Sequence, residues 1–122
     1  MPNYVIIDVE TTQNPQTRKE EIIEFAGIEL DKDFSILQEF SSLINPGIPL
    51  SFITRKVTGI SEAHLMNQPS LAEVLPKIDS FIKDKIIIAH NASFDMHALA
   101  NAYLSCNLTL PSLQVVDSLK IA

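Results

Sequence analysis

The chain has 122 residues, of which 46% are hydrophobic, and this is enough for one domain with a buried core. Its fifteen acidic and nine basic residues give a net charge of −6, which argues against a protein that coats long stretches of nucleic acid. The first residues do not resemble a secretory signal, no apolar run approaches the ~18 residues that cross a bilayer, and a lone Cys106 cannot form an internal disulfide. We therefore expect a soluble, cytoplasmic protein without a membrane partner.

The first predicted element is an apolar strand over residues 4–7, which leads directly to Asp8 and Glu10. Since side chains alternate along a strand, these two carboxylates point to the same side, roughly 6–7 Å apart. Neighbouring carboxylates repel each other, so the pair is costly unless a cation lies between them, and Mg²⁺ takes such oxygen ligands. The pattern alone is equally compatible with Glu10 opening a solvated loop and Asp8 capping a turn.

Two more strands are predicted next, over residues 21–30 and 35–44. A polar loop at 12–20 precedes them, and a short turn at 31–33 separates them. Asn45, Pro46 and Gly47 then end the third strand. With the strand at residues 4–7, these segments indicate a meander.

Helical patterns follow. Residues 51–57 and 61–66 each predict a short helix, and Ser70 with Glu73 has the capping-box spacing that begins a longer one. Pro76 lies inside the longer helix and is expected to kink or loosen it. The apolar face of that helix is formed by Leu71, Val74, Leu75, Ile78, Phe81 and Ile82.

The last part of the chain predicts two short strands and two helix starts. Residues 86–88 are apolar and β-branched, which suits a buried central strand. Asn91 or Ser93 can cap a helix that continues through residue 103. Residues 114–116 form the last short strand, and Asp117 can cap a helix that begins at Ser118.

Three strands followed by helices that alternate with two short strands predict an α/β domain with a mixed sheet. The sequence stops at Ala122, just inside an apparent helix, and a helix needs several turns to bury a face. We therefore expect residues 1–122 to be the N-terminal portion of a single, C-terminally truncated domain.

A second polar group follows the predicted central strand. His90 and Asn91 come directly after it, and Asp95 lies in the first turn of the next helix, where the helix dipole favours an anion. Ligands of open α/β sheets gather at the carboxyl ends of strands, so Asp95 would approach Asp8 and Glu10 if the two strands are neighbours. Three converging carboxylates are a plausible two-metal site. The alternative is that Asp95 only balances the helix dipole and Asn91 only caps the helix.

Five segments, in chain order, also carry a family resemblance: residues 5–12, residues 21–28, Pro49 with residues 57–61, residues 89–95, and residues 116–119. They resemble the first motif, second strand, connecting region, second motif and following strand-to-helix step of the proofreading-type 3′→5′ exonucleases. These enzymes form the DEDD superfamily. The resemblance is greatest to epsilon-type proofreading subunits of bacterial replicative polymerases and to exonuclease domains fused to bacterial polymerases or helicases. It implies a ribonuclease H-like fold, a mixed five-stranded sheet flanked by helices.

The resemblance also implies roles for individual residues. Asp8, Glu10 and Asp95 would be the catalytic residues and would bind two divalent metal ions, Mg²⁺ or Mn²⁺. The backbone at Thr11 and Thr12 would meet the terminal nucleotide. The other substrate-binding residues would be His90, which is expected to buttress the strand end through a hydrogen bond, Asn91, and Phe94, which is expected to pack under the site. Gln13 stands where these enzymes usually have Gly.

The family's third motif, a His followed five positions later by an Asp, supplies the general base and a fourth metal ligand, and it lies beyond the last strand found here. His90 and Asp95 have that spacing but already match the second motif. General-base catalysis is typically worth ~10²–10⁴-fold, so we expect this chain to be inactive or weakly active.

The predicted function is therefore hydrolysis of the terminal phosphodiester at a single-stranded 3′ end of DNA, with RNA also possible as substrate. A polymerase or helicase, in the same chain or a separate one, is the expected partner. One alternative is a non-catalytic module of the same fold that docks on a polymerase or a nucleic-acid end. A remote alternative is a haloacid dehalogenase-like phosphatase, whose Asp-x-Asp-x-Thr motif resembles the segment from Asp8 to Thr12.

Overall fold

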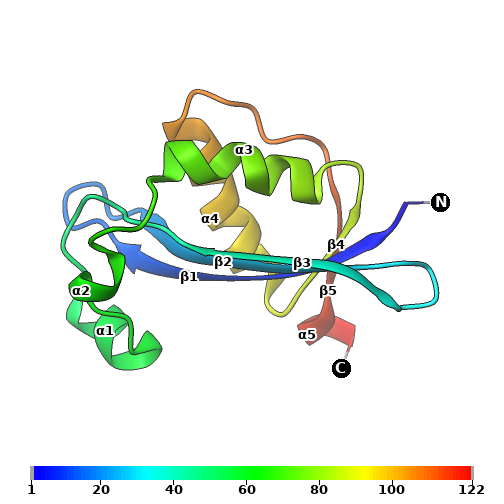
Figure 1. Cartoon of the computed structure of the whole chain (residues 1–122), viewed down its shortest axis with the longest axis horizontal. Helices are drawn as coiled ribbons and strands as arrows, with labels where there is room; N and C mark the ends of the chain where they lie inside the picture. The colour runs from blue at the N-terminus through cyan, green and yellow to red at the C-terminus, as the bar shows by residue number, and fades with distance from the viewer. Residues whose placement is uncertain (1, 122) are drawn as a thin grey trace.

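The computed structural model describes residues 2–121, apart from the side chain of Ile121. Its strands form one mixed sheet in the order β3-β2-β1-β4-β5. The first three strands form an antiparallel meander, and the last two run parallel to β1. The strands are β1 (Tyr4–Gln13), β2 (Glu20–Leu30), β3 (Ile36–Leu43), β4 (Ile86–Ala89) and β5 (Gln114–Asp117). The expected α/β fold with a mixed five-stranded sheet is confirmed (Figure 1).

Helices lie on both sides of this sheet. They are α1 (Phe52–Thr58), α2 (Glu62–Leu65), α3 (Leu71–Ile82), α4 (Ala92–Ser105) and α5 (Ser118–Ile121). In Figure 1, α3 lies above the sheet, while α1, α2 and α5 lie below it. Within residues 2–121, no helix has the length and apolar character needed to span a bilayer.

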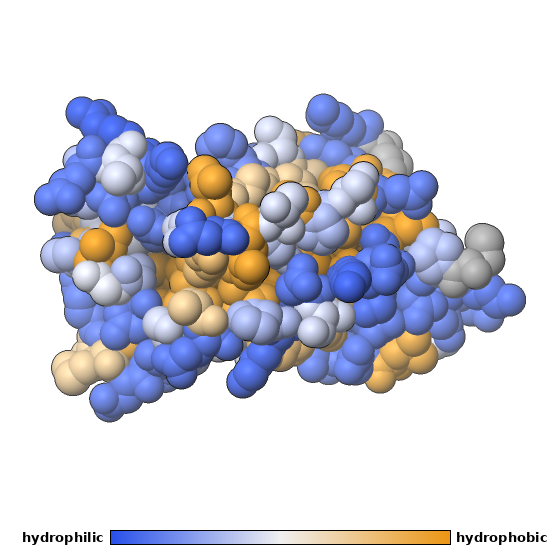
Figure 2. Space-filling view, turned by 90° about the horizontal axis from the view of Figure 1, so that it is seen from above, coloured by the Kyte–Doolittle hydropathy of each residue, from blue (hydrophilic) through white to orange (hydrophobic). Residues whose placement is uncertain are grey.

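The main core lies between the sheet and the helices α3 and α4. Val5, Ile7 and Val9 of β1 are buried there, because alternate side chains of a strand point to the same face. A side chain at Gly27 would lie 2.7 Å from the ring of Phe81, so the absence of one allows α3 to approach the sheet closely. On the outer side of α3, hydrophilic side chains are interspersed with apolar ones (Figure 2).

Two local predictions differ from the structure. β1 continues to Gln13 instead of ending in a loop at Thr12, because a bulge after Glu10 lets the strand stay paired with residues 20–22 of β2. Asn91 occupies the N-cap position of α4, but its backbone is left-handed and its side chain makes no capping bond, and Ser93 lies inside the helix. The helix α3 continues as one element across Pro76, and the kink expected there stays a prediction.

Candidate active site

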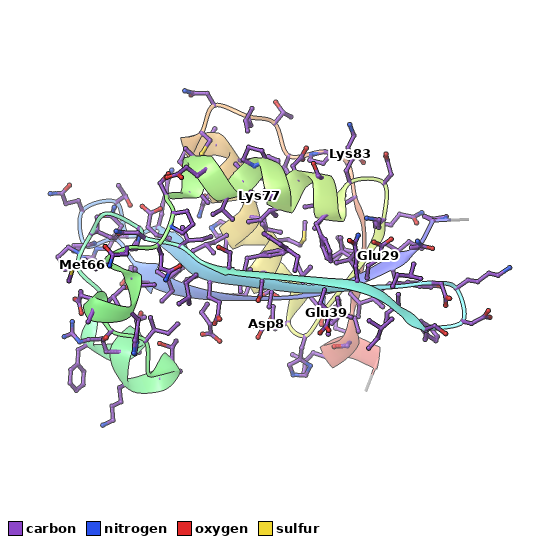
Figure 3. All side chains as sticks on the ribbon, in the orientation of Figure 1. Asp8, Glu29, Glu39, Met66, Lys77 and Lys83 are labelled. Atoms are coloured by element: carbon purple, nitrogen blue, oxygen red, sulfur yellow. The ribbon has the colours of Figure 1, made fainter. Side chains whose placement is uncertain are left out.

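Asp8 and Glu10 lie on the face of β1 opposite the main core. Along β1 the side chains at positions 5, 7 and 9 are buried, whereas Asp8 is exposed and Glu10 is half-buried. Figure 3 shows Asp8 on the side of the sheet away from α3. The alternation predicted from the sequence therefore brings both carboxylates to one face, at the middle strand of the sheet.

Asp95 reaches the same region from a different direction. β4 pairs in parallel with β1, with Ile88 opposite Ile6, so the chain leaves β4 beside the segment that leads to Asp8. The helix α4 begins three residues later, and Asp95 lies in its first turn. The Asp95 side chain is only 4% exposed, and its Oδ2 atom is buried without a hydrogen-bond partner among the described residues. A buried, unpartnered carboxylate oxygen is costly and indicates a function for this position.

The electrostatics of these acids are those of neighbouring carboxylates. Burial, and to a smaller extent the charges of Asp8, Glu10 and Asp117, together raise the pKa of Asp95 to about 7. Burial also raises the pKa of Glu10, with added contributions from Asp8 and Glu24. Mutual repulsion of this kind is typical of sites built for a cation or for proton transfer.

Asp117, which the sequence predicts only as a helix cap, is also a neighbour of the site. It pairs with Ala89 in the β4–β5 register, and its Oδ1 atom accepts hydrogen bonds from the backbone N–H of Asn91 (3.1 Å) and Leu119 (3.0 Å). The bond from Leu119 confirms the predicted cap. The bond from Asn91 ties the end of β5 to the segment that enters α4. The one indication of this position in the sequence is that Asp117 directly follows a predicted strand, and the carboxyl ends of parallel strands lie at the same edge of a sheet.

In this conformation these acids are not arranged as a complete metal-coordination site. Within residues 2–121, no group of three or more His, Cys, Asp or Glu side chains is drawn together tightly enough to hold a metal ion. The chemistry of the side chains nevertheless fits a hard divalent cation, because all of them are carboxylates that repel one another. In addition, the Oδ2 atom of Asp95 has no hydrogen-bond partner among the described residues and could coordinate an ion.

A hollow of about 220 Å³ opens directly beside Glu10. Thr11 and Phe94 line it together with Ile53 and Val57 of α1. Phe94 is 40% exposed and forms part of this wall, so it does not pack under the site as expected. The contribution of α1 was not predicted, because it depends on how this helix folds back beneath β1.

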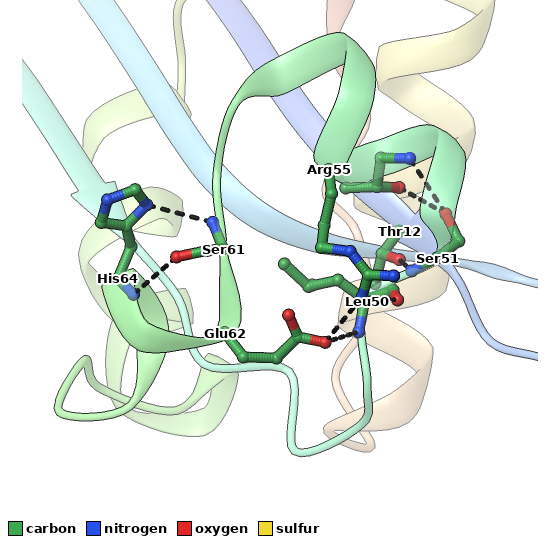
Figure 4. Close-up of polar contacts among 8 residues, drawn as sticks. Thr12, Leu50, Ser51, Arg55, Ser61, Glu62 and His64 are labelled. Carbon is green, nitrogen blue, oxygen red and sulfur yellow. Dashed lines mark hydrogen bonds and ion pairs between the residues drawn. The ribbon is translucent and has the colours of Figure 1, made fainter.

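The remaining predicted substrate-binding residues have distinct surroundings. Thr11 donates a hydrogen bond to Glu20 (2.6 Å), and Thr12 is fully buried, with its hydroxyl accepting from the backbone N–H of Ser51 (2.9 Å; Figure 4). Because the whole Thr12 residue is 0% exposed and is paired with Glu21 of β2, neither its side chain nor its backbone is open to a ligand in this conformation, which differs from the expected contact with the terminal nucleotide. His90 is exposed, and its Nδ1 lies 3.4 Å from the Ser118 hydroxyl, which agrees with the expected hydrogen bond at the strand end.

A larger hollow, of about 530 Å³, lies between the loop at residues 45–50 and α2. None of Asp8, Glu10 and Asp95 lines it. The larger hollow is therefore not proposed as the reaction centre, since Glu10 lines the smaller one.

The chain is similar to known proteins along nearly its whole length. The exonuclease family model RNase_T matches residues 5–122. A DNA polymerase III of the PolC type from Streptococcus pyogenes serotype M18 (strain MGAS8232) is 38% identical over 119 residues, which is 98% of this chain and 8% of that protein. The chain thus spans a small part of the length of such relatives.

Solved structures give a matching fold. The zinc-bound form of E. coli exonuclease I in complex with single-stranded DNA superimposes with a TM-score of 0.86 at 17% identity, covering 99% of this chain and 29% of that one. Exonuclease X in complex with 5′-overhanging duplex DNA superimposes with a TM-score of 0.71 at 26% identity, covering 98% of this chain and 61% of that one.

Proposed function

This chain belongs to the RNase_T exonuclease family, and on that premise we propose that it contributes the active-site acids of a 3′→5′ exonuclease acting on single-stranded DNA. Membership agrees with the resemblance drawn from the ordered motifs. We further propose that residues 1–122 belong to one exonuclease domain, since the described elements share a single sheet.

The observation that carries this proposal is the environment of Asp95. A carboxylate whose Oδ2 is buried and unpartnered, beside Asp8 and Glu10, lowers the stability of the fold and is retained only where it serves a function. We propose that Asp8, Glu10 and Asp95 are the catalytic residues and hold two divalent ions, Mg²⁺ or Mn²⁺. Such ions, when bound, lower the pKa of a water molecule and stabilise charge on the leaving oxygen.

The protein's own residues would bind and orient the 3′-terminal nucleotide. The hollow beside Glu10 has apolar walls from Ile53, Val57 and Phe94, which suit the faces of a sugar and base. The backbone of Thr11 continues directly from Glu10 along the same wall. His90 and Asn91, which follow β4, would lie toward the phosphate side of the site.

A polymerase in the same chain is the partner we propose. The supporting observation is that the PolC-type relative carries a matching segment within a much longer polymerase. DNA is the proposed substrate for the same reason. The likeness to an exonuclease I complex with zinc and single-stranded DNA supports both the metal and the strand.

Binding of the expected product tests this function. We would add thymidine 5′-monophosphate (dTMP) and Mg²⁺ to the isotopically labelled chain and follow backbone NMR signals. The proposal expects shifts around Glu10, Thr11, Val57 and Phe94 that require Mg²⁺ and that are lost in Asp8→Asn. Asp33→Asn, an exposed acid in the β2–β3 turn, is the matched control and should behave as the wild type.

Two results would overturn the proposal. Binding of dTMP that is unaffected by Mg²⁺ and by Asp8→Asn would favour a docking module. Release of thymidine from dTMP, with its phosphoryl group trapped on Asp8 as a phosphoaspartate, would favour a phosphatase.

A further inference from the structure

The outer side of α1 presents an unusually apolar surface to solvent. Phe52, Ile53 and Val57 are 67%, 72% and 75% exposed. Positions 52, 53, 56 and 57 share one side of a helix, so these side chains and Lys56 form a continuous strip, here called the α1 strip. Large apolar side chains that are gathered on one exposed side mark a binding surface more often than apolar side chains that are scattered singly over a protein surface.

Lys56 gives the α1 strip a cation. Its Nζ lies 5.8 Å from the centre of the Phe52 ring, and within residues 2–121 it takes part in no ion pair. The neighbouring Arg55 is different, because it donates to Glu62 (3.0 Å) and to the Leu50 carbonyl (2.9 Å; Figure 4). An exposed aromatic ring beside an uncommitted ammonium group is the combination that binds a base and its phosphate.

The α1 strip is continuous with the hollow beside Glu10. Ile53 and Val57 belong to both surfaces, since they also line that hollow. Phe52 and Lys56 extend the surface outward from it. The helix has seven residues and is therefore about 10 Å long, which spans two or three bases stacked ~3.4 Å apart.

The helix is also held rigidly relative to the site acids. The backbone N–H of Ser51 donates to the buried hydroxyl of Thr12 (2.9 Å), and the hydroxyl of Thr54 donates to the carbonyl of Thr11 (3.0 Å). Thr11 and Thr12 directly follow Glu10, so α1 keeps its position beside the hollow without a ligand. A surface prepared in this way loses little entropy on binding.

From these contacts we propose that the α1 strip binds the nucleotides immediately 5′ of the terminal one in single-stranded DNA. One base stacks on Phe52, and Lys56 contacts a phosphate of the same strand. A strand of this chemistry satisfies both the apolar and the cationic part of the strip, whereas an apolar protein partner leaves Lys56 unpaired. This inference rests on the proposed function, because it places the terminal nucleotide in the hollow beside Glu10.

Ligand length provides the test. The wild-type chain and the double variant Phe52→Ala/Lys56→Ala would be titrated in Mg²⁺ with dTMP and with a five-nucleotide oligothymidylate whose phosphorothioate links resist hydrolysis. The proposal expects the double variant to bind the five-mer about tenfold more weakly, as loss of one stacked base and one phosphate contact implies. Its affinity for dTMP should stay within about twofold of wild type, because dTMP does not reach the strip.

Matched variants separate a binding role from general damage. Leu104→Ala/Lys77→Ala removes an exposed apolar residue and a lysine from α4 and α3, and it should bind both ligands normally. Phe52→Trp/Lys56→Arg should retain tight five-mer binding, because it keeps the ring and the charge.

The inference is overturned if the double variant binds the five-mer as tightly as the wild type, or if it loses dTMP and five-mer affinity equally. Failure of the wild type to bind dTMP is a different result, because it contradicts the proposed function itself and removes the α1 strip proposal with it.

Discussion

At the scale of single residues, Asp95 shows how the site exchanges stability for function. Its carboxylate is buried, one of its oxygens has no partner, and three other acids raise its pKa. Side chains placed this way are commonly destabilising, and their removal stabilises the fold. We expect the buried Asp95 carboxylate to lower the free energy of unfolding whenever no cation is bound.

We therefore predict that Asp95→Asn stabilises the metal-free chain. The substitution keeps the size of the side chain and removes the repelling charge, so the free energy of unfolding at pH 8 should rise by about 1–2 kcal/mol. Urea denaturation in the presence of a chelator measures this change. Asp33→Asn should alter stability by less than about 0.5 kcal/mol. A less stable Asp95→Asn chain would contradict the repulsion described here.

Residue-level features of the site were partly predictable. The shared face of Asp8 and Glu10 follows from strand alternation, which is a local rule. The proximity of Asp117 was not predictable to the same degree, because it depends on the parallel pairing of Ala89 with Asp117 across the sheet. The exposure of Phe94 likewise depends on the position of α1, which its own sequence neighbours do not reveal.

At the scale of elements, the important joint lies between β5, β4 and the start of α4. Asn91 stands before α4 with φ 63° and ψ 58°, a left-handed conformation that Asn adopts more readily than other non-glycine residues and that a further hydrogen bond can stabilise. The Asp117 carboxylate provides it by accepting the Asn91 N–H. This bond helps set where α4, and hence Asp95, begins.

We predict that the Asn91 amide exchanges with solvent about two- to tenfold faster in Asp117→Ala than in wild type, because a hydrogen bond contributes about 0.5–1.5 kcal/mol. Asp117→Asn keeps an acceptor oxygen and should preserve the slow exchange. Hydrogen exchange followed by NMR distinguishes the two variants. Unchanged exchange in Asp117→Ala would show that the bond does not hold this joint.

Most elements were predictable from local pattern, and the exceptions have tertiary causes. The capping box of Ser70 and Glu73 begins α3 as expected, because it depends on a spacing of three residues. The extension of β1 to Gln13 was missed, since it depends on pairing with β2 beyond a bulge. Asn91 failed as a side-chain cap because its backbone is left-handed, which sequence alone does not indicate.

At the scale of the whole molecule, Glu29 joins parts of the chain that are far apart in sequence. It accepts hydrogen bonds from Asn3 (2.8 Å) and Gln38 (2.6 Å), and Lys85 lies 3.5 Å away. Burial alone would raise the pKa of Glu29, but these donors and the lysine charge lower it below 4.5. The ionised form is therefore stabilised by folding and links β2, β3, the N-terminus and the segment before β4.

The sign of the pH dependence follows from this lowered pKa. Glu29 contributes stability above its unfolded-state pKa, and that contribution is lost as pH falls through the folded-state value. Glu29→Gln should cost about 1–3 kcal/mol at pH 7, and its stability should converge with that of wild type toward pH 3. Denaturation curves between pH 7 and pH 3 measure the difference.

Glu39→Gln is the matched control, because Glu39 is an exposed acid on the neighbouring strand (Figure 3). Its stability should follow wild type across the range. A constant gap between Glu29→Gln and wild type down to pH 3 would show that the ionisation of Glu29 does not support the fold.

We propose that Asp8, Glu10 and Asp95 act together as a binding site for divalent ions at the edge of the hollow. Calorimetric titration of Mn²⁺ into the metal-free chain, with dTMP present, measures this binding. Binding is expected for the wild type and for Asp33→Asn, with affinity at least about tenfold weaker in each of Asp8→Asn, Glu10→Gln and Asp95→Asn. Equal Mn²⁺ affinity in all five proteins would contradict it.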